Sequence, residues 1–537
     1  MGNFMENLSD RMNTSITTNG AKGYKTTGNL LLDFNFSIAT LRGEEPEKII
    51  EKWIPLYEEC KYNNETSVAL KYLFWIRDIR EGLGERKIFR VIMKYLYEYD
   101  PNSIIPTLIF IPIFGRWDDL IYLLDKNTNK LIYDYIISLL KNQIIEDYNT
   151  ATMKSPINNE KYNINQISLL AKWMPSVNTS SERTVEKAKE ISKAFGWSYK
   201  RYRKTMSILR KYIGIVEEKM SSNKWEEIQY ENVPSKANLL YARTFMKHDE
   251  ERRLQYISDL QNGKTTINSS VLFPHDIVHK LNNEPSSADV FESMWKALPN
   301  LVDENSRTIV VGDGSCSMTT CINRSTTVTS EEVCIGLCLY FAERLKGEFH
   351  NKYITFSEHP ELVNLLDSTR FVDKVAICRK YNEIANTNIE AVFRLILGVA
   401  IDNNMKQDEI PDNILIISDM EFDGCAVMDG SVVNNKLMDT AKTMFKVHGY
   451  KLPRIIFWRV NGRTDTIPMI QNDLGVILVS GFSLNIVKMV MSGKTDPYEC
   501  LLEQILSERY KCIGSKLELN KDYIFKGNII TDTKKDN

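Results

Sequence analysis

The chain has 537 residues, a formal net charge of -2, 43% hydrophobic residues and 26% charged residues. Because this length exceeds what one hydrophobic core usually serves, we expect two or more domains. The composition is that of an ordinary soluble protein, which excludes a collagen-like or low-complexity chain, and the balanced charge argues neither for nor against nucleic-acid binding.

The cysteines and the apolar runs bear on where in the cell the protein is expected to reside. There are nine cysteines, an odd number without a C-x-x-C pair, so we expect free thiols in a reducing compartment and no structural zinc. We find no secretory signal. The longest apolar run, Ile104–Phe114, contains Pro106 and Pro112 and is too short to span a bilayer. The expectation is an intracellular, cytoplasmic protein without membrane contact.

The first 300 residues predict an arm followed by helices. Residues 1–25 are rich in Asn, Thr, Ser and Gly without periodicity, which indicates a flexible arm. Residues 26–300 show helical patterns. The clearest lie in Ile88–Tyr99 and Ile132–Leu140, where apolar residues recur at the spacing of one helix face. A long run of amphipathic helices predicts a stacked helical array.

A basic segment lies within this helical region. Arg183–Lys211 holds ten Lys or Arg and two Glu, interleaved with aromatic residues. If a helix begins after Ser198, a suitable N-cap, one of its faces is cationic and can contact phosphates. The opposite face is apolar, and the nearby aromatic side chains can stack on unpaired bases. The alternative is a solvated charged face with aromatics in the core. The predicted RNA-binding residues are Lys200, Arg203, Lys204 and Lys211; the apolar face comprises Met206, Leu209, Ile213, Val216 and Met220; and the aromatics are Phe195, Trp197, Tyr199 and Tyr202.

Two other sets of polar residues in this region are expected to have structural roles. His275 and His279 have the spacing of the two histidines in H-E-x-x-H, but Asp276 replaces the glutamate and no third ligand is apparent, so we expect a structural helix rather than zinc hydrolysis. Arg80, Arg86, Arg116 and the turn Trp117–Asp119 are expected to link helices, because paired Arg and Asp satisfy one another when partly buried.

From residue 301 to residue 515, apolar strands alternate with helical segments. This alternation predicts a doubly wound α/β domain with a parallel sheet, and residues 516–537 form a tail. The expected strands are 308–311, 352–356, 414–417, 454–460 and 475–479, and the expected helices are 331–346, 389–400, 436–445 and 498–511.

Oxygen-bearing side chains follow two of these strands. Asp313, Ser315 and Ser317 form a D-x-S-x-S turn after the first strand, Thr387 opens a helical run, and Asp419 follows another strand. Because ligands bind outside the carboxyl ends of strands in open α/β sheets, these five residues can share one Mg²⁺ or another divalent cation. The alternative is that D-G-S is an ordinary turn. A phosphoaspartate enzyme would need a second acid where Ser315 stands, and a G-x-S-x-G elbow lacks both glycines.

This set of residues resembles the metal-ion-dependent adhesion site (MIDAS) of von Willebrand factor A domains. In that family the serines and the threonine ligate the metal directly or through water, the aspartates act mostly through water, and an acidic group of a partner completes the site. The resemblance implies a Rossmann-like domain and an acidic protein ligand. The sequence departs from the family at Cys316 and at Ala385-Asn386, where glycines are common.

The N-terminal part resembles the Ro autoantigen (TROVE) proteins through Arg77–Arg86, Phe114–Leu120 and Leu170–Ser176. The chain is more similar to an uncharacterised family with an A-like C-terminal domain, seen in plants, fungi, slime moulds and giant viruses. Ile455–Trp458 and Gly475–Ser483 also fit that family. The resemblance implies a HEAT-like helical array, closed to a ring in Ro proteins, that binds structured RNA or single-stranded RNA ends.

Together these features predict a non-enzymatic RNA-binding or ribonucleoprotein scaffold with a MIDAS-type site for a protein ligand. A metal-dependent protein-interaction module without RNA binding is the alternative, and a metal-dependent hydrolase is a more distant one. The identities of the RNA and the protein partner, closure of the array into a ring, the oligomeric state and metal occupancy stay open at this point.

Overall fold

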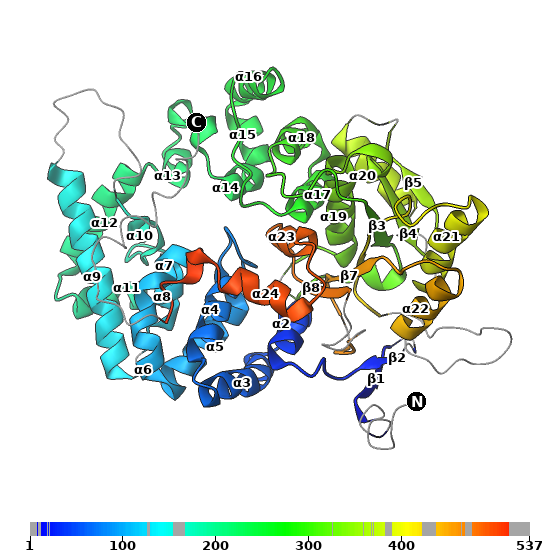
Figure 1. The fold of residues 1–537 in the computed structure, drawn as a ribbon. Helices are drawn as coiled ribbons and strands as arrows, with labels where there is room; N and C mark the ends of the chain where they lie inside the picture. The colour runs from blue at the N-terminus through cyan, green and yellow to red at the C-terminus, as the bar shows by residue number, and fades with distance from the viewer. Residues whose placement is uncertain are drawn as a thin grey trace. The chain divides into compact units, whose positions relative to one another are not determined.

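The computed structural model, drawn in Figure 1, comprises two compact units. One unit comprises residues 1–58 and 230–505, and the other comprises residues 59–229 and 506–537. The described residues are 8, 12–18, 20, 22–125, 129–153, 167–324, 326–357, 359–366, 368, 370–381, 389–421, 437–462, 464–467 and 475–514.

The unit of residues 59–229 and 506–537 is helical in its described part, as the sequence predicts. Consecutive helices pack on one another, with α4 on α5, α7 on α8, and α9, α10 and α11 on α12. It also contains the C-terminal part of α3 (Pro46–Tyr62). Its other helices are α4 (Thr66–Arg77), α5 (Arg86–Tyr99), α6 (Pro101–Ile104), η1 (Ile105–Phe110), α7 (Ile111–Phe114), α8 (Trp117–Leu123), α9 (Lys130–Met153), α10 (Leu170–Trp173), α11 (Glu182–Ala194), α12 (Tyr199–Ile213), α13 (Val216–Ser221), η3 (Trp225–Glu227) and η8 (Glu508–Tyr510).

Helix α5 shows how the spacing of apolar residues in the sequence produces these helices. Its apolar residues recur every three or four positions, so they share one face, and Ile88, Ile92 and Leu96 are fully buried. The helix ends at Tyr99, and Asp100 caps the next helix by accepting from the backbone N–H of Ser103 at 3.3 Å. Pro101 at the first position of α6 suits a helix start.

The other unit contains a six-stranded sheet in the order β5-β4-β3-β6-β7-β8. All neighbouring pairs are parallel except β4 and β5, which are antiparallel. The strands are fully or nearly fully buried, as expected for a parallel sheet, apart from the edge strand β5. Their bounds are β3 (Thr308–Asp313), β4 (Lys352–Phe356), β5 (Leu362–Asn364), β6 (Asn413–Ser418), β7 (Arg454–Arg459) and β8 (Val476–Ser480).

Helices cover this sheet, and further helices pack outside them. Helix α19 contacts β3, β4 and β6, and α17 packs on α19, as Figure 1 shows, while α2, α23 and α24 contact β8. The helices are α2 (Leu30–Leu41), η4 (Tyr230–Asn232), α14 (Ser235–Leu240), α15 (Ala242–His248), α16 (Glu250–Gln261), α17 (Pro274–Asn283), η5 (Pro285–Ser287), α18 (Ala288–Lys296), η6 (Cys316–Thr319), α19 (Ser330–Arg344), η7 (Gly347–Phe349), α20 (Phe371–Lys380), α21 (Ile389–Asp402), α22 (Leu437–Val447), α23 (Ile486–Met491) and α24 (Pro497–Ile505).

The strand order reverses between β3 and β6. This is the order of a doubly wound sheet, whose ligands bind at the carboxyl ends of the strands beside the reversal. The α plus α/β architecture expected from the sequence is therefore confirmed. The domain boundaries at residues 25, 300 and 515 stay a prediction, since the two compact units each draw on separate stretches of the chain.

Two sequence expectations are wrong. Part of the expected flexible arm forms a hairpin of β1 (Thr14–Ile16) and β2 (Lys22–Tyr24), because the backbone of Tyr24 pairs with Ile467 and Thr18 N–H donates to Glu421 at 2.9 Å. The late helix expected to reach Lys511 ends as α24 at Ile505, and the short helix η8 follows it.

Candidate metal centre and cationic helix face

The end of strand β3 carries the first half of the predicted metal site. Asp313 is the last residue of the strand and only 2% exposed. Ser315 N–H donates to Asp313 Oδ1 at 2.9 Å, which closes the turn, and the hydroxyls of Ser315 and Ser317 lie 2.9 Å apart. The D-x-S-x-S segment thus gathers one carboxylate and two hydroxyls, with Cys316 pointing to solvent between them.

Strand β6 supplies the second half across the reversal in strand order. Its last residue, Ser418, donates its hydroxyl hydrogen to Asp313 Oδ2 at 2.5 Å, which ties the ends of β3 and β6 together. The chain then turns sharply at Met420, whose φ is +65°. Asp419 Oδ1 accepts from the backbone N–H of Glu421 at 3.2 Å, and Asp419 is 3% exposed.

The charges at this site favour a cation. Burial and the nearby charge of Asp419 both raise the pKa of Asp313. Arg459 lies near Asp419, but its guanidinium is buried and donates to the carbonyl oxygens of Asn461 and Thr464. Two buried carboxylates beside two hydroxyls are hard oxygen donors, which suit Mg²⁺. When bound, a divalent cation would offset the repulsion between the two acids and offer a coordination position to an acidic ligand.

The donor set differs from those of zinc sites built on His and Cys. In the described part of the chain, no group of three or more His, Cys, Asp or Glu is placed to hold a metal ion. Of these four residue types, the candidate site contains only Asp313 and Asp419. Its other described ligands would be the hydroxyls of Ser315 and Ser317. Thr387, the fifth predicted ligand, lies outside the described residues.

Two residues of this site were not predicted from the sequence. Ser418 holds Asp313, and Glu421 links the turn after Asp419 to the N-terminal hairpin. The carboxylate of Glu421 also accepts from the backbone and hydroxyl of Thr464 at 2.7 and 2.9 Å. Both are polar residues in the run Ser418–Glu421, at the end of an apolar strand. Their position at a strand end is the feature of the sequence from which a role in the site could have been predicted.

The predicted RNA-binding residues share an exposed surface of α12. Ser198 caps this helix by accepting from Arg201 N–H at 3.2 Å, as predicted. Lys200, Arg203, Lys204 and Lys211 are all exposed, and Met206, Leu209 and Ile213 are buried on the other side. We call the four exposed cations the cationic face. The helix therefore docks through its apolar side and leaves the cationic face in solvent.

Two details of this prediction are wrong. The helix ends at Ile213, because Gly214 adopts a left-handed conformation with φ of +65°, so Val216 and Met220 belong to α13 instead. The aromatics are also less available than expected. Phe195, Trp197 and Tyr202 are at most 8% exposed and form a cluster, which leaves Tyr199 as the exposed ring.

The histidine pair forms a structural contact in the described structure. His275 is 4% exposed between the rings of Phe273 and Phe482, and burial lowers its pKa to about 4. His279 Nδ1 lies 2.7 Å from Glu332, in the first turn of α19. Both side chains thus connect α17 to its neighbours, as the structural interpretation predicts.

The turn Trp117–Asp119 links helices, as expected, but the side-chain partners of Asp119 are Arg77 and Arg90, which were not predicted, rather than Arg80 and Arg86. Asp119 has a fully buried carboxylate that accepts from Arg77 Nε at 2.9 Å, from Arg90 Nε at 2.6 Å and from the backbone N–H of Arg116 at 2.9 Å. These contacts join α4, α5 and the start of α8. The related pair Asp78 and Arg509 joins α4 to η8.

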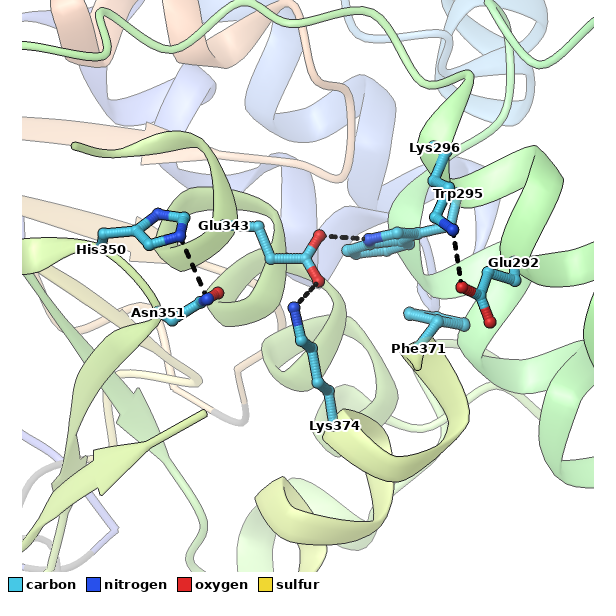
Figure 2. Close-up of a pocket in the computed structure, with 8 residues that line it drawn as sticks. All are labelled: Glu292, Trp295, Lys296, Glu343, His350, Asn351, Phe371 and Lys374. Carbon is cyan, nitrogen blue, oxygen red and sulfur yellow. Dashed lines mark hydrogen bonds and ion pairs between the residues drawn. The ribbon is translucent and has the colours of Figure 1, made fainter. Parts of the chain in front are cut away.

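A small cavity of about 240 Å³ lies between α18, α19 and α20 (Figure 2). Figure 2 shows Glu343 between Trp295 and Lys374, and its carboxylate accepts from both, at 2.6 and 2.8 Å. Trp295 also stacks on Phe371, with ring centroids 4.4 Å apart. These contacts bind the three helices together, so we assign the cavity a structural role.

The chain is similar to domains and a protein without an assigned function. A domain of unknown function, DUF7788, matches residues 307–513, and another, DUF2828, matches residues 182–310. An uncharacterised protein of Acanthamoeba polyphaga mimivirus is 28% identical over 522 residues, which are 91% of this chain and 87% of that protein. The similarity thus extends over nearly the full length of both proteins.

Two solved structures align weakly. A Ro (RSR) protein of Deinococcus radiodurans aligns with 77% of this chain and 93% of its own, at 10% identity and a TM-score of 0.35. Proximal thread matrix protein 1 of the mussel byssus, with a zinc-occupied MIDAS motif, aligns with 35% of this chain and 48% of its own, at 12% identity and a TM-score of 0.23. At these scores, neither alignment carries the assignment of fold or function.

None of the helices in the described ranges is long and apolar enough to cross a bilayer.

The functional candidates are the oxygen-lined site at the ends of β3 and β6 and the cationic face of α12.

Proposed function

We propose that the chain is a non-enzymatic scaffold that holds a divalent cation at Asp313, Ser315, Ser317 and Asp419 and uses it to recruit an acidic group of a protein partner. The observation that carries this proposal is the convergence of those four side chains beside the reversal in strand order. The arrangement corresponds to the MIDAS of an A-type domain, with Thr387 as the remaining ligand and Mg²⁺ as the ion.

The roles of the residues follow from their contacts. Asp313 has both carboxylate oxygens engaged by Ser315 and Ser418, so it acts best through a metal-bound water. The hydroxyls of Ser315 and Ser317 lie 2.9 Å apart, which is close enough for both to ligate one ion. The side chains of the set are oxygen donors that suit a hard cation, which supports a binding role.

The proposal includes RNA as the ligand of the second unit. The cationic face projects four positive charges from one helix, which is what contact with successive phosphates requires. In this proposal, a HEAT-like array similar to that of Ro proteins binds RNA, the A-type domain recruits the protein partner, and the scaffold works in the cytoplasm.

Fluorescence anisotropy with labelled RNA tests this part. The intact chain should bind at low salt, and affinity should fall about 50-fold between 50 and 200 mM salt if all four cations contact phosphates, since each contact contributes about 0.7 to the salt slope for single strands. Replacing Lys200, Arg203, Lys204 and Lys211 with Glu should abolish binding. Absence of RNA binding at 50 mM salt would leave a metal-dependent protein-interaction module, the alternative function.

The recruiting role has its own test. A fluorescent peptide rich in Asp and Glu should bind the intact chain in Mg²⁺ and be released by EDTA. The variant Ser315→Ala/Ser317→Ala should not bind it in Mg²⁺, because it lacks two ligands. Binding that is equal in Mg²⁺ and EDTA would contradict a metal-mediated contact. A hydrolase would instead require an activity that is lost on replacing Asp313 or His275.

A further inference from the structure

A cavity of about 770 Å³ opens beside the cationic face. It lies within the unit of residues 59–229 and is lined by α10, α12, α13 and the segment after α10. This volume falls in the usual range of small-molecule sites, about 300–1,000 Å³. Of the four cations of the cationic face, Arg203 and Lys204 line the cavity, whereas Lys200 and Lys211 do not.

The wall of the cavity is held in place by hydrogen bonds. Arg210, on α12, donates to the carbonyl oxygens of Ala171 and Met174 at 2.9 and 2.6 Å and to the hydroxyl of Ser176 at 3.0 Å. Tyr202 donates to the carbonyl oxygen of Pro175 at 2.8 Å. The segment 171–176 is therefore fixed against α12 before any ligand arrives, which lowers the ordering cost of binding.

The lining combines three kinds of chemistry. Val177, Met206 and Ile215 supply apolar surface, and Arg203 and Lys204 supply positive charge. Helix α13 adds two carboxylates, Glu217 and Glu218. Glu217 lies 4.0 Å from Lys172, a loose ion pair, and Glu218 is exposed.

These features match one unpaired nucleotide. The base can lie against the apolar surface, and Arg203 and Lys204 can donate hydrogen bonds to the phosphate oxygens. A carboxylate has two acceptor oxygens and pairs best with two parallel N–H groups. Among RNA bases, guanine presents such a pair through N1–H and its amino group, whereas uracil offers one N–H flanked by two carbonyl oxygens that a carboxylate repels.

We propose that this cavity binds one unpaired base of a single-stranded RNA and selects guanine through Glu218. The inference rests on the proposed RNA binding of the cationic face and adds a base preference to it. In a duplex the donors of guanine are already paired, so a double-stranded RNA of the same sequence binds through charge alone.

The test compares two labelled 12-nucleotide RNAs, oligouridine and oligouridine with one central guanosine, by anisotropy at one salt concentration. The intact chain should bind the guanosine RNA about 10-fold more tightly. Glu218→Gln should reduce this ratio to about twofold or less, because a neutral amide offers one acceptor oxygen. Glu226→Gln removes the same charge outside the cavity and should keep the 10-fold ratio.

A second variant blocks the cavity without changing its charge. Ser207 lines the cavity from an exposed position on α12, so Ser207→Trp should fill it. This variant should bind both RNAs alike, at the affinity of oligouridine. Lys200→Gln, by contrast, should weaken both RNAs equally and keep the ratio.

The outcomes separate the two proposals. If neither RNA binds at 50 mM salt, the RNA function itself fails. If both bind equally to the intact chain, or if Glu218→Gln and Ser207→Trp keep the guanosine preference, RNA binding survives and the base pocket is wrong. Binding of a polyglutamate peptide as tightly as the guanosine RNA would show that charge alone accounts for the affinity, which also overturns the base pocket.

Discussion

Replacing Asp119 with alanine should unfold the helices around it while the sheet-containing unit stays folded. Its carboxylate is fully buried, and it receives hydrogen bonds from Arg77, Arg90 and the backbone of Arg116. Removing one partner of a buried ion pair costs about 3–5 kcal/mol, because the remaining charge stays buried. Arg77, whose side chain is 5% exposed, would carry that cost.

The lost contact at the start of α8 adds about 1 kcal/mol, as expected for a helix cap. The sum, roughly 4–6 kcal/mol, is a large part of the 5–15 kcal/mol that stabilises a typical domain. Hydrogen–deuterium exchange followed by mass spectrometry measures this locally. A loss of about 4 kcal/mol corresponds to exchange roughly a thousandfold faster in peptides from α4, α5 and α8.

Asp118→Ala is the matched control. Its side chain is 20% exposed and contacts Arg90 and Arg116 near the surface, so the expected cost is about 1 kcal/mol or less. The reasoning would be refuted if Asp119→Ala exchanged like the intact chain, or if α4 and β6 lost protection to the same degree. If the double variant Asp119→Leu/Arg77→Met recovered part of the lost protection from exchange, the unpaired charge of Arg77 would be identified as the cause of the destabilisation.

Three further predictions follow from single sites. Because the pKa of His275 is about 4 when folded and about 6.5 when unfolded, the unfolded state binds more protons between these values, and stability falls as pH drops below 6.5. The loss should reach about 2 kcal/mol by pH 5, and thermal melts of His275→Leu should lack this part of the pH dependence. Glu421→Gln should weaken Mg²⁺ binding by a few fold, read by calorimetry, because it loosens the turn after Asp419; an unchanged affinity would exclude that role. Glu343→Ala should lower the melting temperature by several degrees, since it leaves the buried ammonium group of Lys374 without its ion-pair partner, whereas the exposed Glu348→Ala should not.

The strands could be predicted from the sequence because a parallel sheet buries both faces of each strand. Apolar runs therefore marked β3, β4, β6, β7 and β8 to within two residues. The three-residue edge strand β5 was not predicted, since it is too short to show a pattern. The hairpin of β1 and β2 was missed because its contacts with Ile467 and Glu421 lie more than 400 positions away in the sequence.

The candidate site shows the same limits. Asp313, Ser315, Ser317 and Asp419 could be proposed as ligands because polar residues ended apolar strands at positions that a doubly wound sheet brings together. Ser418 and Glu421 were not predicted, because their roles depend on hydrogen bonds to other segments of the chain. On α12 the charges were predicted correctly, but Gly214 ended the helix earlier than its apolar spacing suggested.

Calorimetric titration of the intact chain with Mg²⁺ tests the central claim most directly. The account predicts one saturable site per chain, an affinity at least 10-fold weaker in Ser315→Ala/Ser317→Ala, and no change in Thr319→Val, which removes a neighbouring exposed hydroxyl. Equal binding by the intact chain and the double-serine variant would contradict a cation site at the ends of β3 and β6.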